Sequence, residues 1–181
     1  MSSMRTLMIG AVALTVGTFA SCKAPQRPDG GEGLLPAGAP VPDLSATDHN
    51  GDAVRLRDRT DPVVVYFYPK DGTPGCTKEA CAFRDAWKAF ERAEVDVIGV
   101  STDSPESHRE FAREHALPFS LVSDEDETWV GAFGVKTRLG IASRVSFLLA
   151  RNEVIKTYPD VDPAVHASEV LADAASTRDK P

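Results

Sequence analysis

Residues 63–91 read VVVYFYPKDGTPGCTKEACAFRDAWKAFE, and most of the expected architecture follows from this stretch. Its first residues are all β-branched or aromatic, which predicts a buried strand over Val63–Tyr68. A loop rich in glycine and proline follows. Apolar residues then recur at steps of four and three, which predicts a helix over Cys76–Glu91. The positions on this apolar stripe are Cys76, Ala80, Phe83, Trp87 and Phe90.

The two cysteines of this stretch are placed for redox chemistry. Cys76 falls in the first turn of the predicted helix, where unsatisfied N–H groups and the helix dipole favour a thiolate, the nucleophilic form. Cys81 follows five residues later. In an intact helix their Cα atoms would lie about 8.5 Å apart, whereas a disulfide needs about 7 Å or less. Pairing therefore requires the helix to unwind. The competing interpretation is a buried structural cysteine beside a bystander.

Strand and helix patterns alternate along the rest of the chain. Before them, Asp43–Leu56 reads as two short strands around an Asn50-Gly51 turn. Further strands are predicted at Val95–Val100, Phe119–Val122, Val145–Leu149 and Val154–Tyr158, and helices after Ser104-Pro105, around Asp126–Phe133 and over Pro163–Ala174. This order predicts an α/β fold with an N-terminal β-hairpin and a mixed central sheet flanked by helices.

The run YFYPKDGTPGCTKEACAFRD, residues 66–85, resembles the active-site signature of the Q-type peroxiredoxins, also called bacterioferritin comigratory proteins. The similarity continues through VIGVSTD (97–103), LVSDED (121–126) and RVSFL (144–148), so it covers most of the chain from about residue 41. The resemblance implies a thioredoxin-like fold for residues 42–175.

The resemblance also implies a reaction and its residues. Cys76 would attack hydrogen peroxide or an organic hydroperoxide, and Cys81 would resolve the sulfenic acid to an intramolecular disulfide. A thioredoxin-like dithiol would then reduce this disulfide, without any metal or other cofactor. Pro69, Thr73 and Arg144 match the remaining members of the family's active-site set.

The position of Arg144 in the sequence also indicates a role, independently of the family resemblance. It stands immediately before a predicted core strand, where a charged side chain is expected to be paired. Its forked donors could stabilise both a thiolate and peroxide oxygens. The alternative is a surface arginine at a strand entrance. The segment Gly134–Ser143 should border the same site. It is shorter than in many relatives, so the preferred peroxide remains open, as does the physiological reductant.

The N-terminus has the features of an export signal. Arg5 precedes an apolar run over Leu7–Ala20, which is shorter than the roughly 20 residues of a membrane span. Phe19-Ala20-Ser21-Cys22 resembles the lipobox of bacterial lipoproteins, although Phe19 replaces the usual leucine. We therefore expect a signal peptide over residues 1–21 and a lipid on Cys22, which would anchor the exported protein to a membrane facing the periplasm or the cell exterior. An ordinary secretory signal is the alternative.

Amino-acid composition and net charge indicate the nature of the remaining segments and of the partners. Residues 22–41 are rich in proline and glycine and are expected to form a tether, and residues 176–181 a frayed tail. Removal of the leader deletes Arg5, leaving 19 of the 20 Lys+Arg against 27 Asp+Glu, a net charge of −8. That charge argues against a nucleic-acid partner. We expect a monomer.

Two other functions fit parts of the pattern. A membrane-tethered copper chaperone of the Sco type would share the fold, the anchor and paired cysteines, with His166 as distal ligand, but that family uses C-x-x-x-C. An exported thiol-disulfide oxidoreductase would be expected to have C-x-x-C and a cis-proline at the position of Arg144. His108 and His115 share one helical face with Phe111 and are expected to pack there rather than to bind metal.

Overall fold

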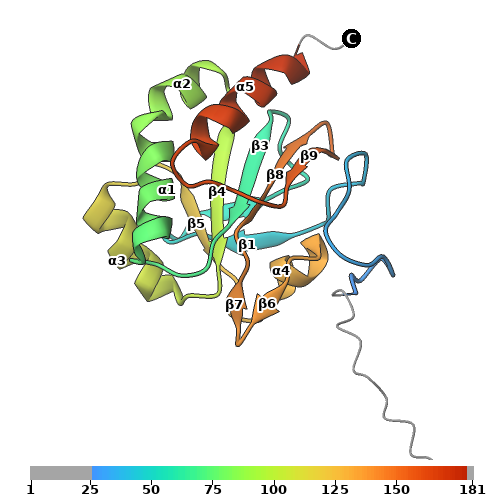
Figure 1. The fold of residues 1–181 in the computed structure, drawn as a ribbon, viewed down its shortest axis with the longest axis horizontal. Coiled ribbons are helices and arrows are strands. Elements are labelled where there is room, and N and C mark those ends of the chain that lie inside the picture. The colour runs from blue at the N-terminus through green and yellow to red at the C-terminus, as the bar shows by residue number, and fades with distance from the viewer. Residues whose placement is uncertain (1–25, 179–181) are drawn as a thin grey trace, which may run out of the picture.

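The computed structural model describes residues 26–178, which fold around a five-stranded sheet of order β5-β4-β3-β8-β9 (Figure 1). Strands β3, β4 and β5 are parallel, and β8 and β9 are antiparallel to their neighbours. Their bounds are β3 Val63–Phe67, β4 Asp96–Ser101, β5 Ser120–Ser123, β8 Val145–Ala150 and β9 Glu153–Tyr158. The predicted mixed central sheet is confirmed.

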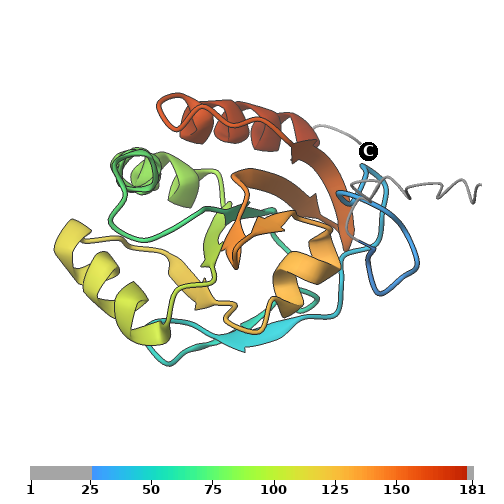
Figure 2. The same ribbon diagram turned by 60° about the horizontal axis from the view of Figure 1, so that its bottom comes forward.

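The alternation of side chains in β3 divides the core into two layers. Val64 and Tyr66 face one layer and Val65 and Phe67 the other, as the two-residue period of a strand requires. The first layer is covered by α1, α2, α3 and α5, and the second by α4 and the hairpin β1–β2 (Figure 2). The helices are α1 Pro74–Asp85, α2 Trp87–Arg92, α3 Pro105–His115, α4 Thr128–Phe133 and α5 His166–Arg178.

Two hairpins lie outside the central sheet. The predicted N-terminal hairpin is present as β1 (Ser45–Thr47) paired with β2 (Ala53–Arg55). A second hairpin, β6 (Thr137–Arg138) with β7 (Ile141–Ala142), was not predicted. Its two-residue turn has positive φ at Leu139 and Gly140, as a primed turn requires.

The helix that carries the cysteines begins earlier than its apolar pattern indicates. Thr73 is the N-cap and Pro74 occupies the first turn, where a missing N–H costs nothing and the fixed φ suits a helix. Cys76 is thus the third residue of α1. The predicted single helix over Cys76–Glu91 is also divided at Ala86, whose φ of −87° and ψ of 0° separate α1 from α2.

The prediction of a tether is wrong for residues 26–41, which pack along the domain beside β9 (Figure 2). Leu35 and Val41 are 2% and 4% exposed. The backbone N–H of Leu35 donates to Phe133 O at 3.1 Å, and that of Gly38 to Val154 O at 2.8 Å. Proline and glycine here set turns whose donors find acceptors on the domain, so their abundance did not mean an unpacked chain.

The other terminal predictions are met only in part or lie beyond the described residues. Residues 176–178, predicted to be part of a frayed tail, continue α5, and the Ser176 hydroxyl donates to Asp173 O. The signal peptide over residues 1–21, the lipid site Cys22 and residues 179–181 lie outside the described part. Within residues 26–178, no helix is long and apolar enough to cross a membrane.

Candidate active site

The site forms where β3 ends and α1 begins. The loop between them carries Pro69 and Thr73, and places Cys76 in the first turn of α1. Cys76 is only 1% exposed. Backbone N–H groups of a first helical turn and the positive end of the helix dipole favour negative charge at this position.

Strand pairing brings Arg144 to the same place. Val145 of β8 pairs with Phe67 of β3, so the preceding residue, Arg144, lies beside the loop that follows β3. Its Nη2 donates to Cys76 Sγ at 3.1 Å, while Nη1 donates to a carboxylate oxygen of Glu79. The guanidinium therefore bridges the thiol and an acid. The prediction that Arg144 is paired rather than a surface residue is confirmed.

Glu79 is a site residue that the sequence analysis missed. It follows Cys76 by three residues on the buried face of α1 and is fully buried. Burial raises the pKa of Glu79 to about 7, although the charge and hydrogen bond of Arg144 oppose that rise. Its Oε1 has no hydrogen-bond partner among the described residues. A charge at helical spacing on an otherwise apolar stripe was the signal that could have revealed it.

Gly75 allows the guanidinium to approach the start of the helix. A Cβ atom at this position would lie 3.3 Å from Arg144 Nη2, closer than most such contacts. A larger residue would push the guanidinium away from Cys76 Sγ. Glycine therefore leaves room for the guanidinium here.

Thr73 and Pro69 are brought into the same loop. The Thr73 hydroxyl donates to Lys70 O at 3.0 Å and makes no capping bond to the helix. With its proton engaged, the hydroxyl keeps lone pairs that can accept a hydrogen bond. Pro69 is half-buried and follows Tyr68, the first residue beyond β3.

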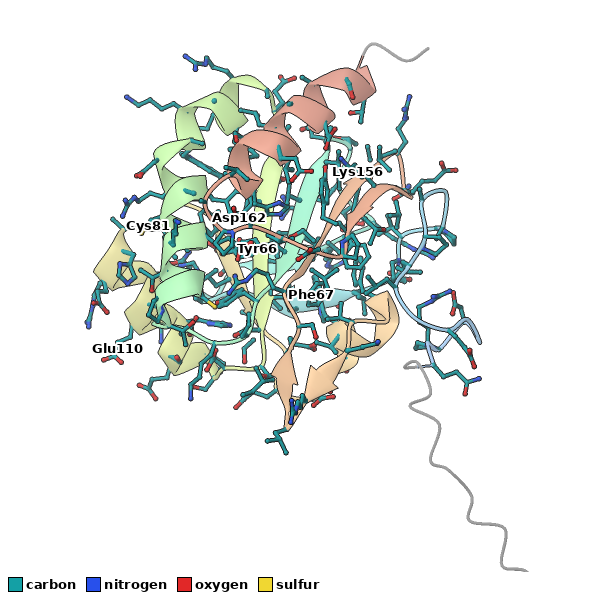
Figure 3. The ribbon with its side chains drawn as sticks, in the orientation of Figure 1. Tyr66, Phe67, Cys81, Glu110, Lys156 and Asp162 are labelled. Atoms are coloured by element: carbon teal, nitrogen blue, oxygen red, sulfur yellow. The ribbon has the colours of Figure 1, made fainter. Side chains whose placement is uncertain are left out.

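The second cysteine is held apart from the first. Cys81 lies on α1 and is half-buried (Figure 3), and both Cys76 and Cys81 are free thiols. Helix α1 is continuous over Pro74–Asp85 and so includes both residues. At about 8.5 Å between Cα atoms five apart in an α-helix, they cannot bond until the first turns unwind.

Within the part of the chain that the structure describes, the histidines and cysteines are not grouped as metal ligands. His166 is fully buried, and its Nε2 lies 2.8 Å from Ser146 Oγ. Burial, with the charges of Arg144 and Lys156, lowers the pKa of His166 to about 4. Across residues 26–178, no three His, Cys, Asp or Glu side chains are placed to hold a metal. The His115 ring packs against the Phe111 ring, with 5.0 Å between the ring centroids.

A thiol in the first turn of a helix, contacted by an arginine beside a mixed α/β sheet, is an arrangement expected of a thiol-dependent oxidoreductase. Comparisons with known proteins identify the family. The model of the AhpC/TSA family matches residues 37–158. The chain belongs to this family, and within it to the peroxiredoxin Q group, which also includes the bacterioferritin comigratory proteins.

Individual relatives agree with this assignment. Peroxiredoxin Q of Sedum lineare is 39% identical over 159 residues, which cover 85% of this chain and 86% of that protein. A putative peroxiredoxin bcp of Coxiella burnetii is 39% identical, covering 76% of this chain and 97% of its own. The bacterioferritin comigratory protein of Xanthomonas campestris, solved in a study of its alkyl peroxide reduction activity, aligns with a TM-score of 0.71 at 36% identity, covering 80% and 99% of the two chains.

The family membership settles the general activity and fold. The chain is a peroxiredoxin with a thioredoxin-like fold, and it acts as a thiol-dependent peroxidase that uses a thioredoxin-like reductant. The copper chaperone and the disulfide oxidoreductase considered as alternatives are not favoured.

Proposed function

We propose that Cys76 is the residue that attacks the peroxide and that Cys81 resolves the product. The Cys76 thiolate attacks one peroxide oxygen, the O–O bond breaks, and the other oxygen takes a proton and leaves as water or alcohol. The Cys81 thiolate then attacks the sulfur of the Cys76 sulfenic acid, and hydroxide leaves and is protonated to water. An external dithiol reduces the disulfide by two exchange steps.

The observation that carries this assignment is the 3.1 Å contact between Arg144 Nη2 and Cys76 Sγ. It gives Cys76 a charged donor that stabilises the thiolate, and the same fork can reach a peroxide oxygen next to the sulfur. Thr73 would accept a hydrogen bond from the peroxide hydroxyl, since its own proton is given to Lys70 O. Pro69, with its fixed φ, would hold the loop in the shape that presents these groups.

Hydrogen peroxide and alkyl hydroperoxides are the proposed substrates. The Xanthomonas campestris relative, whose alkyl peroxide reduction has been studied, supports the second class. We propose that the β6–β7 hairpin borders the site. It is tied to the end of β4, where the Thr102 hydroxyl donates to Gly140 O at 2.6 Å. Leu139 at the tip of the hairpin is 94% exposed, and we propose that an organic substrate contacts this apolar side chain.

Replacing the resolving cysteine tests the assigned roles. Cys81→Ser is expected to consume about one equivalent of peroxide rapidly and then to stall, because the Cys76 sulfenic acid has no internal thiol to condense with. Stopped-flow peroxide consumption with intact-mass analysis of Cys76 would show this, the wild type with thioredoxin serving as control. Sustained thioredoxin-dependent turnover at the wild-type rate would contradict the role of Cys81.

We further propose that the protein is an exported, monomeric lipoprotein with its lipid on Cys22. Support comes from the apolar leader, the lipobox-like Phe19-Ala20-Ser21-Cys22 and the odd number of cysteines, of which two are assigned to the redox pair. With residues 26–41 packed on the domain, the enzyme would stand closer to the membrane than a free tether would place it.

The lipid assignment predicts membrane attachment that depends on one side chain. The mature protein should sediment with membranes, and Cys22→Ser should release or misprocess it while the purified domain keeps its peroxidase activity. Membrane fractionation and the intact mass of the mature N-terminus would measure this. A soluble product that is cleaved elsewhere and keeps Cys22 unmodified would disprove lipidation and leave the enzymatic assignment unaffected.

A further inference from the structure

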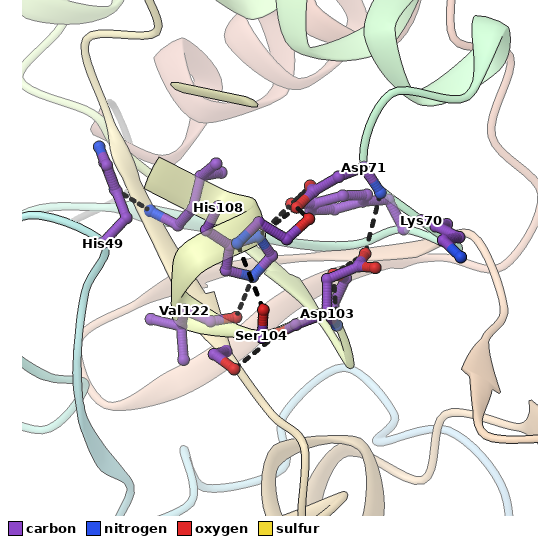
Figure 4. A network of polar contacts seen from close by, with 12 residues as sticks. His49, Lys70, Asp71, Asp103, Ser104, His108 and Val122 are labelled. Atoms are coloured by element: carbon purple, nitrogen blue, oxygen red, sulfur yellow. Dashed lines mark hydrogen bonds and ion pairs between the residues drawn. The ribbon is translucent and has the colours of Figure 1, made fainter. Parts of the chain in front are cut away.

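The loop before Cys76 is tied to the rest of the domain by one buried carboxylate. Asp71, with a side chain 7% exposed, accepts hydrogen bonds from the Tyr68 hydroxyl at 2.8 Å and the Ser107 hydroxyl at 2.7 Å. His108 Nδ1 lies 2.8 Å from the same carboxylate (Figure 4). The backbone N–H of Asp71 also donates to Asp103 at 2.9 Å. The loop is thus fixed to α3 and to the segment that follows β4.

Both ring nitrogens of His108 have oxygen partners. Its Nδ1 faces the Asp71 carboxylate, and its Nε2 lies 3.2 Å from Val122 O. Both ring nitrogens therefore lie against oxygen atoms, and the ring is fixed between the loop and β5. Burial acts to raise the pKa of Asp71, but the hydrogen bonds from His108, Ser107 and Tyr68 hold it below its usual range. Asp71 and His108 therefore form a buried hydrogen-bonded pair.

This buried pair would oppose a movement that the proposed reaction needs. The sulfenic acid on Cys76 has two fates: condensation with Cys81, or further oxidation by a second peroxide molecule. Condensation requires α1 to unwind from its N-terminus, which begins directly after the loop that holds Asp71. Further oxidation requires the intact site. Contacts that hold the loop therefore favour the second fate.

We propose that Asp71 and His108 are positioning residues that hold the loop before Cys76 against α3, and so set how often Cys76 is over-oxidised before Cys81 reaches it. This inference rests on the proposed roles of Cys76 and Cys81. Neither Asp71 nor His108 has a hydrogen bond to Cys76 in the described structure; they act through the loop. When the loop is held against α3, it keeps Thr73 and the helix start in place for attack on the peroxide. When the loop is released from α3, helix α1 can unwind and the disulfide can form.

Asp71→Asn tests the inference because it keeps the size of the side chain and removes its charge. Reduced protein is mixed with hydrogen peroxide, quenched with a thiol-alkylating reagent at successive times and analysed by intact mass. The rate constant of disulfide formation is expected to rise at least tenfold, because an amide has one acceptor oxygen and cannot keep the hydrogen bonds that both carboxylate oxygens make to Tyr68, Ser107 and His108. The over-oxidised fraction per turnover should fall by a similar factor, and the initial attack on peroxide should slow.

Asp48→Asn is the matched control. Asp48 is a buried carboxylate that accepts hydrogen bonds from its own turn and from Ser120, and its hydrogen bonds involve none of the residues between Tyr68 and Cys76. At similar loss of thermal stability it should leave the rate of disulfide formation unchanged. A similar rise in this control would mean that stability in general, and not the loop contact, sets the partition.

Ser107→Ala provides a milder second variant should Asp71→Asn not fold. It removes one hydrogen bond to Asp71 and should shift the partition in the same direction, by a smaller factor. If folded variants keep the wild-type ratio of over-oxidised to disulfide product, the inference is wrong. A wild type that forms no Cys76–Cys81 disulfide would instead contradict the proposed function, so the two failures are distinguishable.

Discussion

Cys76→Ser is expected to reduce peroxide consumption to the level of the buffer alone. A serine hydroxyl is not ionised near neutral pH, so the nucleophile is lost although the shape of the side chain is nearly kept. Arg144 would then lack the sulfur atom that it contacts at 3.1 Å. Cys81, the other cysteine of the described residues, lies in the middle of α1, away from the first turn.

A thioredoxin-coupled peroxide assay measures this loss, with hydrogen peroxide and an alkyl hydroperoxide as separate substrates. The control is Cys81→Ser, which should retain a single rapid turnover under the same conditions. Thermal unfolding of Cys76→Ser should show a folded protein, because serine is close in size to cysteine. Full steady-state turnover by folded Cys76→Ser protein would mean that another group attacks the peroxide.

Much of the fold could be predicted because it depends on regular periods. The all-apolar run in β3 and the steps of four and three in α1 each bury a face, and burial leaves a pattern in the sequence. The start of α1 was placed two residues late for the same reason. Thr73 and Pro74 begin the helix without contributing to its buried face, so the apolar pattern does not include them.

The features that were missed have no period of their own. The strands β6 and β7 have two residues each, too few for an alternation to be recognised. Residues 26–41 bury only isolated side chains such as Leu35 and are held by backbone hydrogen bonds, which composition does not encode. Their proline and glycine content is shared by packed loops and free linkers.

The residues of the site also divide into those that a local sequence pattern predicts and those that it does not. Cys76 could be predicted from its local setting, and the family match supplied Arg144. Glu79 was missed because charged side chains are common on helices, and its hydrogen-bond partner Arg144 is 65 residues away. The contact between Asp71 and His108 joins residues 37 apart in the sequence. Such contacts follow from the packing of α3 against the sheet, which no local pattern reports.

Arg144→Ala is expected to lower the second-order rate constant for peroxide by about 10²-fold or more, the usual scale for losing one preorganised electrostatic donor at a reacting centre. The donor to Cys76 Sγ disappears, and so does the fork that could bind the peroxide oxygens. The same change leaves the buried Glu79 carboxylate without its cation. An unpaired buried carboxylate destabilises the fold, so a loss of stability could be mistaken for a loss of catalysis.

Two matched variants separate these effects. Arg144→Ala combined with Glu79→Gln removes the unpaired acid and should recover stability but not the rate. Arg144→Lys keeps one charge without the fork and should fall between the wild type and Arg144→Ala, because a lysine cannot contact the sulfur and the acid with two parallel donors. Stopped-flow rate constants for peroxide and for alkylation of Cys76, with thermal unfolding of each variant, make the comparison. A wild-type rate constant in folded Arg144→Ala protein would show that the contact with Cys76 has no catalytic value.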